Sequence, residues 1–300
     1  MIKVKDKIKI NADLEKIKKE SLYELSKDPD IKNFLQINHI DYQTMSKYWS
    51  VFLNYYEDKK LCSHCQGLDY CPKISKGLCE TLHYDGMVTT TLSFCRYGKI
   101  REKDHTILTK FVFNNLSDKI ALTKLEETVL WKKGLQEDKD SLIKLKKILD
   151  YLDHPVTHGF YFYDENSSHA TLIGASLMNA LAGKGYKTGI CNFPTLLYDM
   201  KTSFSQTSTE SYLKQILDIP YLLIDGLGDE NVGGWSRDEI LLTLLNYRAI
   251  NELPTFFTSS FSIDELQNVY TIRLRDKTDQ MRARKIAGKV TGMADEIILI

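Results

Sequence analysis

The chain has 300 residues, and its 40 Lys plus Arg balance its 40 Asp plus Glu, so the formal net charge at neutral pH is zero. This length is enough for two domains of ordinary size. The overall charge predicts no partner, so any nucleic-acid contact must come from a local basic patch. The start, MIKVKDKIKINADLEKIKKE, is too polar for a signal peptide, and no run is long and apolar enough to span a membrane. We therefore expect a cytoplasmic protein without a membrane partner.

The first part of the chain, residues 12–60, has apolar residues at helical spacing. The segments DLEKIKKESLYELSK and YQTMSKYWSVFLNYYEDKK predict amphipathic helices, and Asp28-Pro29 is a helix-start signal. Residues 61–97 differ, because they contain glycines, cysteines and short alternating runs such as MVTTTLSFC, which predict strands. We predict a small, mainly helical domain over residues 1–97.

Five of the six cysteines lie in this small domain: Cys62, Cys65, Cys71, Cys79 and Cys95. In a cytosolic chain, a cluster that opens with C-x-x-C is more typical of a metal site than of a disulfide framework. Two thiolates of one tight turn can bind a single tetrahedral ion, so the pattern predicts a structural Zn²⁺ site. Cys62, Cys65 and Cys95 are the firmest ligands, with Cys71 as the fourth and Cys79 as the alternative fourth. A set of reduced, buried cysteines is the competing interpretation.

The rest of the chain has a different pattern. Residues 98–150 are charged and mostly helical, with DKDSLIKLKKILDYL as the clearest helix, and we predict a helical connector there. In residues 151–300, the apolar runs GFYFY, GYKTGICNFP, IPYLLID and LPTFFTSSF alternate with helical patterns. This alternation predicts a mostly parallel sheet with helices on both faces. The fold class is therefore α/β, with a helical zinc-binding domain before the parallel-sheet domain.

The turn after GFYFY is where many α/β proteins bind phosphate. Here it reads DENSSHAT, residues 164–171, and contains neither glycine nor lysine. Asp225 ends the run IPYLLID, and an acid at that end of a buried strand can hold Mg²⁺ beside a nucleotide. A strand that simply ends in Asp at a turn is the alternative.

Two stretches carry a resemblance to a known family. YLLIDGLGDENVGGWSRDEILLTLLNYRAINELPTFFTSSFSIDEL resembles the Walker B strand and following segments of the DnaI-type bacterial helicase loaders, and more loosely those of the DnaC type. CSHCQGLDYC, KDPDIKNFLQ and GLDYCPKISKGL resemble the zinc domain of the same family. The resemblance spans about the whole chain in the correct order. It implies a small zinc domain before an AAA+ module, which has the P-loop NTPase fold.

The family resemblance also implies partners. The zinc domain of such proteins binds the replicative hexameric helicase, and the AAA+ module binds ATP and single-stranded DNA while the helicase is loaded. Other primosome proteins are further partners, and members can form homo-oligomers. The resemblance places Arg237 where a neighbouring subunit's nucleotide could be reached.

The chain departs from the family at the nucleotide motifs. The family loop reads G-x-x-x-x-G-K-T/S, whereas here Ala170 replaces the lysine and only Thr171 of the motif is kept. The second Walker B acid is Gly226, and the sensor 1 asparagine is Ser260. The sensor 2 arginine aligns with Lys289. These changes predict that nucleotide binding is lost.

The function implied by these observations is that of a primosome protein that binds the replicative helicase and assists or regulates its loading as a pseudo-ATPase. No catalytic residue is expected, and Thr171, Asp225, Arg237 and Lys289 are interpreted as remnants of an ATP site. Zn²⁺ is the expected cofactor, and no use of ATP or Mg²⁺ is expected. One alternative is a decoy or inhibitor of the helicase or of a true loader. A second is an ATP-dependent loader with an unorthodox nucleotide site.

One segment near the C-terminus, YTIRLRDKTDQMRARKIAGK, is locally basic. It supplies four candidate contacts for the DNA backbone: Arg273, Arg275, Arg282 and Arg284. A solvated helix face is the alternative.

Overall fold

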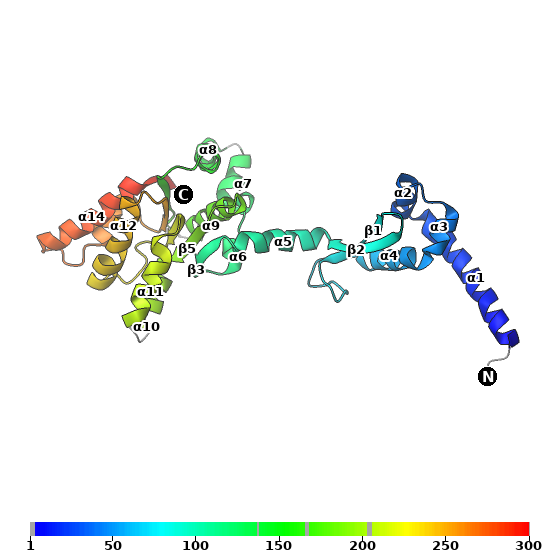
Figure 1. The fold of residues 1–300 in the computed structure, drawn as a ribbon. Helices are drawn as coiled ribbons and strands as arrows, with labels where there is room; N and C mark the ends of the chain where they lie inside the picture. Colours follow the sequence, from blue (N-terminus) through cyan, green and yellow to red (C-terminus); the bar gives the residue numbers. More distant parts are fainter. Residues whose placement is uncertain (1–3, 137, 166–167, 203–205, 300) are drawn as a thin grey trace. The chain divides into compact units, whose positions relative to one another are not determined.

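The computed structural model describes residues 4–136, 138–165, 168–202 and 206–299 (Figure 1). The chain divides into two compact units, Met1–Lys103 and Asp104–Ile300. The division falls within helix α5 (Arg96–Leu108). Residues 104–150, which the sequence analysis assigned to a connector, therefore lie in the second unit. None of the helices in these ranges is long and apolar enough to cross a membrane.

The first unit packs helices against a two-stranded hairpin. Its elements are α1 (Val4–Lys27), α2 (Pro29–Ile37), α3 (Tyr42–Lys47), α4 (Trp49–Cys62), β1 (Leu78–Tyr84) and β2 (Val88–Phe94). Helix α2 begins at Asp28 because this carboxylate accepts hydrogen bonds from the N–H groups of Asp30 and Ile31, while Pro29 suits the first helical position. A small apolar core holds the unit together: Leu22, Leu25, Ile31, Met45, Phe52 and Val88.

The second unit is built on a six-stranded sheet with the order β3-β5-β6-β7-β4-β8 and parallel pairing throughout. The strands are β3 (Phe111–Asn114), β4 (Gly159–Tyr163), β5 (Thr188–Asn192), β6 (Tyr221–Asp225), β7 (Thr255–Ser259) and β8 (Ala294–Ile298). The predicted parallel sheet is confirmed. Two strands were not predicted, β3 in the stretch expected to be helical and β8 at the C-terminal end, and they form the two edges of the sheet.

Helices cover both faces of this sheet, as predicted. Alternate strand residues face opposite sides, so Leu222 and Ile224 join one core while Leu223 and Phe256 join the other. The first core includes α10 (Phe193–Thr202), α11 (Gln206–Leu217), α12 (Leu242–Ile250), α13 (Ile263–Val269) and α14 (Lys277–Met293). The second includes α7 (Val129–Leu135), α8 (Lys139–Asp153) and α9 (Ser168–Gly183). The shorter α6 (Asp118–Ala121) packs against α9.

Candidate functional site

The carboxyl ends of β6, β7 and β4 lie side by side along the carboxyl end of the sheet, because these strands are parallel neighbours. Helix α9 begins at Ser168, soon after β4 ends. Ligands of open α/β sheets bind at this kind of edge, where helix N-terminal N–H groups can bind phosphate. We call the loop 164–165, the start of α9 and the ends of β5, β6 and β7 the nucleotide edge.

At this edge, an acid of the chain itself lies against the start of α9. Asp164 is 4% exposed, and its Oδ2 accepts a hydrogen bond from the N–H of His169 at 3.2 Å. The same oxygen lies 3.2 Å from His169 Nδ1. A helix N-terminus favours a negative charge, so Asp164 provides there the kind of charge that a phosphate would bring. Asn166 and Ser167 of the predicted loop lie outside the described residues.

The buried carboxylate of Asp225 is the centre of the nucleotide edge. Its Oδ1 accepts hydrogen bonds from Thr171 Oγ1 and Thr258 Oγ1, both at 2.6 Å, and its Oδ2 accepts one from Asn192 Nδ2 at 2.8 Å. The residue is 2% exposed. Gly226 N–H donates to Thr258 Oγ1 at 3.0 Å, which extends the cluster into the next turn. Asp225 therefore joins α9 to three strands by hydrogen bonds within the chain.

At two altered motif positions, the structure disfavours the residue that the family has there, once because of packing and once because of the backbone. Ala170 is fully buried in α9, so a lysine at this position would have to place its charged chain among packed neighbours. Gly226 has φ +73°, and a Cβ built there would lie 3.3 Å from Pro194 Cδ. An acid at position 226 would have to adopt a left-handed backbone, which aspartate accepts less readily than glycine.

The sensor positions lie apart in the described structure. Ser260 follows β7, and its hydroxyl donates a hydrogen bond to the carboxylate of Asp229. Lys289 is half-buried on α14, and no hydrogen bond or ion pair in the described ranges joins it to Asp225. Of the predicted remnants, the structure therefore brings together Thr171 and Asp225, which are joined directly.

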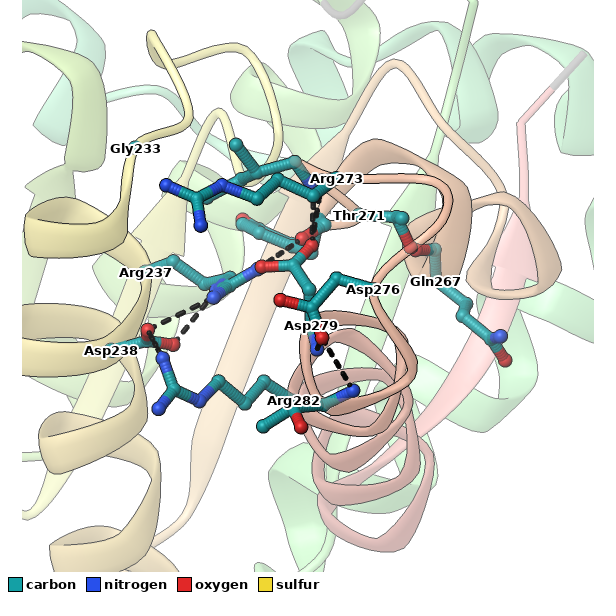
Figure 2. Close-up of polar contacts among 12 residues, drawn as sticks. Gly233, Arg237, Asp238, Gln267, Thr271, Arg273, Asp276, Asp279 and Arg282 are labelled. Carbon is teal, nitrogen blue, oxygen red and sulfur yellow. Dashed lines mark hydrogen bonds and ion pairs between the residues drawn. The ribbon is translucent and has the colours of Figure 1, made fainter.

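Arg237, which the family resemblance places within reach of a neighbour's nucleotide, is bonded to partners of its own chain. Arg237 lies in a π-helical segment, Trp235–Leu241, and its side chain is 1% exposed. It pairs through two nitrogens with Asp238, at 2.7 and 2.9 Å, and through Nη1 with Asp279 Oδ1, at 2.8 Å. Nη1 also donates to the carbonyl of Tyr270 at 2.9 Å. Figure 2 shows the guanidinium between Asp238 and Asp279, and these contacts make Arg237 an internal structural cation.

A second buried arginine, Arg248, follows Tyr247 in the segment NYRAI and is also structural. Arg248 is fully buried and donates hydrogen bonds to the carbonyls of Ile219 at 2.7 Å and Pro254 at 2.8 Å, and to Thr255 Oγ1 at 2.8 Å. Burial lowers the pKa of its guanidinium to about 9, because desolvation disfavours the charged form. This arginine ties the loop before β6 to the loop before β7.

The cysteine segments lie beside one another without forming a complete ligand set. Cys62 ends α4, and the N–H of Cys65 donates to its carbonyl at 3.2 Å in a tight turn. Tyr97 OH reaches the Cys65 carbonyl at 3.5 Å, and Gly98 N–H donates to Cys95 Sγ at 3.4 Å. The N–H group of Gly98 would also stabilise Cys95 as a thiolate ligand. In the described part of the chain, however, no group of three His, Cys, Asp or Glu side chains is placed to hold a metal ion.

The two candidates for the fourth ligand differ in their surroundings. Cys79 lies on β1, and its thiol donates to the carbonyl of Ser93 across the hairpin at 3.6 Å. Cys71 lies in the loop between α4 and β1, where its N–H donates to the carbonyl of Leu68 at 3.2 Å. All five clustered cysteines are partly exposed, unlike the buried Cys191. Zinc binding stays a prediction.

The four candidate DNA contacts are all exposed: Arg273, Arg275, Arg282 and Arg284.

The sequence did not reveal three residues of the hydrogen-bonded clusters. Asn192 and Thr258 bond to Asp225 at the nucleotide edge, and Asp279 bonds to Arg237. The first two lie at or near the ends of predicted strands, so their polar character could have marked them as members of the nucleotide edge. Asp279 gave no signal beyond an acid in the first turn of a helix, because its partners come from distant segments.

The fold and the nucleotide edge define an α/β protein with a parallel sheet covered by helices on both faces, and with an altered loop where many such proteins bind phosphate. No family model matches the chain. It is 25% identical over 296 residues to the replicative helicase loader DnaI of Bacillus subtilis (strain 168), covering 96% of this chain and 93% of that protein. The resemblance to DnaI-type loaders is thus confirmed over almost the whole length.

Solved structures show the same fold. A crystal structure of DnaI is 22% identical, with a TM-score of 0.55, and covers 63% of this chain and 98% of its own. A candidate primosome component from Streptococcus pyogenes serotype M3 is 22% identical, with a TM-score of 0.52, and covers 65% of this chain and 95% of its own.

Proposed function

We propose that this protein binds the replicative hexameric helicase and assists or regulates its loading on DNA without hydrolysing ATP. The first half of this proposal is supported by similarity along 96% of the chain to a protein named as a replicative helicase loader. The second half depends on one observation: the acids Asp164 and Asp225 at the nucleotide edge are hydrogen-bonded by the chain's own donors.

Charge at the nucleotide edge opposes a triphosphate. A phosphate charge about 4 Å from the Asp164 carboxylate would cost roughly 4 kcal/mol at an effective dielectric constant near 20. The lysine that offsets phosphate charge in the family is replaced by the buried Ala170. Gly226 supplies no second acid, so only Asp225 remains for a metal-nucleotide complex, and its oxygens already accept three hydrogen bonds.

The nucleotide half of the proposal is tested by thermal unfolding with and without Mg²⁺-ATP, measured beside ATP turnover. A ligand at about a hundred times its dissociation constant should stabilise the fold by roughly 2.7 kcal/mol. We expect no shift and no turnover. A clear shift that Asp225→Ala abolishes would overturn the pseudo-ATPase proposal in favour of an ATP-dependent loader with an unorthodox site.

The helicase half is tested by size-exclusion chromatography with the replicative helicase from the same genome, followed by a loading assay on single-stranded DNA coated with binding protein. We expect a stable complex and faster helicase loading. A complex that lowers loading by the true loader would instead identify the decoy or inhibitor. Absence of a complex with either the helicase or a loader would contradict both.

The first unit is the proposed helicase-binding domain, and structural Zn²⁺ is its proposed cofactor. The support is the adjacent placement of the Cys62–Cys65 turn and Cys95, and the N–H group that donates to Cys95 Sγ. When bound, Zn²⁺ would supply cross-linking between these segments and no chemistry. Elemental analysis of purified protein should find about one zinc per chain, and Cys62→Ser with Cys65→Ser should remove it.

A further inference from the structure

The two edges of the six-stranded sheet differ in how well they are protected against further pairing. Within the described structure, β3 has β5 as its one neighbour and β8 has β4. β3 has four residues, and its register with β5 shifts between Phe111 and Phe113, an irregularity that blunts a sheet edge. β8 has five residues, and all of them pair with β4 without a shift. The β8 edge is therefore the better template for a further strand.

The backbone of β8 shows which of its groups face outward. Leu299 N–H donates to the carbonyl of Tyr163 on β4 at 2.8 Å, whereas Ala294 N–H turns away from β4 and donates to a carbonyl of α14. The hydrogen-bonding groups of a strand alternate between its two sides, so the odd-numbered residues of β8 bond to β4. The N–H and C=O groups of Glu296 and Ile298 therefore face the open edge.

Helix α8 lies along β8 in the opposite direction and forms the wall of a groove. Asp150 of α8 and Asp295 of β8 line one hollow of about 340 Å³, and Lys144 of α8 lines a second, smaller hollow with Leu299. We call the open edge of β8 and the larger hollow the β8 groove. The floor of the hollow is formed by two buried aromatic residues in edge contact, with ring centroids 5.2 Å apart: Tyr151 and Phe160.

The two faces of the sheet beside this groove differ in chemistry. Ile297 belongs to the core that includes α8, and Ala294 belongs to the core that includes α13 and α14. Because side chains alternate along a strand, Asp295 lies on the α8 side and Glu296 on the α13 side. The Glu296 carboxylate accepts a hydrogen bond from the N–H of Ile263, in the first turn of α13, at 2.9 Å.

The α13 side carries an acidic patch. Burial, then the negative charges of Glu165, Glu265 and Glu296, raise the pKa of the Tyr163 hydroxyl, so these three carboxylates gather around the end of β4. All three glutamates are exposed. Two copies of the chain joined through their β8 edges would bring like charges together, which disfavours such a pair. The α13 side instead complements a partner with basic side chains.

We propose that the β8 groove binds an extended segment of a partner protein in which basic and apolar residues alternate, and that this segment joins the sheet as a strand beside β8. Alternation in such a strand sends its apolar side chains to one face and its basic side chains to the other. The apolar side chains fill the hollow above Tyr151 and Phe160, the basic ones meet the acidic patch, and the main chain bonds to Glu296 and Ile298. The groove belongs to the second unit, so this inference goes beyond the helicase contact proposed for the first.

The measurement is fluorescence anisotropy of the fluorescein-labelled peptide KVKVKVK titrated with the full chain. Two control peptides separate strand addition from simple charge. KVKPKVK keeps the charge but interrupts the strand, because proline has no N–H group. EVEVEVE keeps the alternation and reverses the charge. We expect KVKVKVK to bind more tightly than either control.

A matched pair of variants tests the backbone of the open edge. Ile298→Pro and Ile298→Ala both remove the isoleucine side chain, but only proline removes the outward N–H group, and it leaves the pairing with β4 in place because position 298 faces away from β4. Loss of one main-chain hydrogen bond should weaken peptide binding by Ile298→Pro roughly three- to tenfold relative to Ile298→Ala. Far-UV circular dichroism and thermal unfolding of both variants check that the fold is kept.

A second pair tests the acidic patch. Glu296→Gln removes one charge and keeps an oxygen that can accept from Ile263 N–H. It should weaken binding of KVKVKVK about two- to fivefold, as expected for an exposed ion pair. Glu126→Gln makes the same change at another exposed position and should leave binding at the native level.

Hydrogen–deuterium exchange of the native chain locates the bound peptide, since the segment 294–299 should exchange more slowly when KVKVKVK is present. Four results would overturn the inference. They are equal binding of KVKVKVK and either control peptide, equal affinity of Ile298→Pro and Ile298→Ala, unchanged exchange in segment 294–299, and slow exchange there that depends on protein concentration without peptide, which would assign the edge to a second copy. The exchange result remains decisive if Ile298→Pro fails to fold. The helicase is absent from these assays, so loss of the helicase complex would remove the proposed function without affecting this result.

Discussion

Two buried carboxylates of the second unit, Asp225 and Asp279, accept three hydrogen bonds each, yet they have opposite consequences for the surface around them. The donors to Asp225 are side chains from α9, β5 and β7, and they meet where a nucleotide would bind. The donors to Asp279 are Arg237 and two N–H groups of a loop that displays cations. The polar groups of the Asp225 cluster are therefore bonded to one another within the fold, while the Asp279 cluster orders an exposed loop that carries cations.

Under the proposed function, the second unit has lost a nucleotide site and kept its architecture. In an ATP site, Asp225 and Thr171 would act through a metal and phosphates. Here they stabilise the sheet edge directly, so the fold does not depend on nucleotide at this edge. The buried Arg237 bonds to Asp279, and Asp279 in turn holds the loop before α14 through two backbone N–H groups. Four variants test this contrast.

The largest effect is expected from Arg237→Met at the Asp279 cluster. Removing one partner of a buried ion pair leaves a charge uncompensated and typically costs about 3–5 kcal/mol. We expect a loss near that range in the free energy of unfolding, measured by urea titration. Arg284→Met makes the same chemical change on an exposed part of α14 and should stay close to the native value. Equal, small losses in both variants would mean that the hydrogen bonds of Arg237 are not structural.

Asp225→Ala tests the closed cluster and should have the next largest effect. It leaves the donors of Thr171, Thr258 and Asn192 without their acceptor, and each unsatisfied buried group costs about 1–3 kcal/mol. We expect a total loss of roughly 3 kcal/mol, because Thr171 and Asn192 are partly exposed and can bond to water. Asp225→Asn keeps one acceptor oxygen and should lose less. Native-like stability in Asp225→Ala, together with lost ATP binding, would assign Asp225 to a nucleotide site instead.

Gly226→Asp restores the second acid of the family motif and should fail to restore the site. A left-handed backbone costs a residue with a Cβ roughly 1–2 kcal/mol, and Gly226 has φ +73°. We expect destabilisation of that size and no gain in ATP turnover. Gly226→Ala is the control, since an equal loss identifies the backbone as the cause. A stable aspartate variant that hydrolyses ATP would contradict this account.

The smallest effect is expected at Glu230, whose carboxylate accepts from Gly228 N–H at 2.8 Å and Tyr270 OH at 2.9 Å. Burial raises its pKa above the ordinary value of 4.5. A folded-state pKa above the unfolded value contributes stability that is present below the unfolded pKa and lost as pH rises through the folded pKa. Relative to Glu230→Gln, the native chain should therefore lose stability as pH rises from about 4 toward neutrality. A difference between the two chains that does not change with pH would remove Glu230 as the titrating group.

Much of the second unit could be predicted from sequence, because buried strands such as GFYFY and YLLID are continuous apolar runs bounded by turns. The edge strands β3 and β8 escaped prediction, since short runs at the sheet margin have a weaker pattern and lie among charged residues. At the site, Thr171 and Asp225 could be named because each stands at a motif position. The partners of Arg237 within its own chain could not be predicted, since motif spacing says nothing about which way a side chain points.

The α/β alternation, the altered phosphate loop, the cysteine spacing and the local basic segment can be recognised in the sequence, because each is carried by residues near one another in the chain. The bonds from Asp225 to four elements, the left-handed backbone of Gly226 and the pairing of Arg237 with Asp238 and Asp279 become visible only in the folded chain. These features depend on contacts between distant segments, such as residues 237 and 279. The free energy of a buried charge depends on the partners that the fold brings to it.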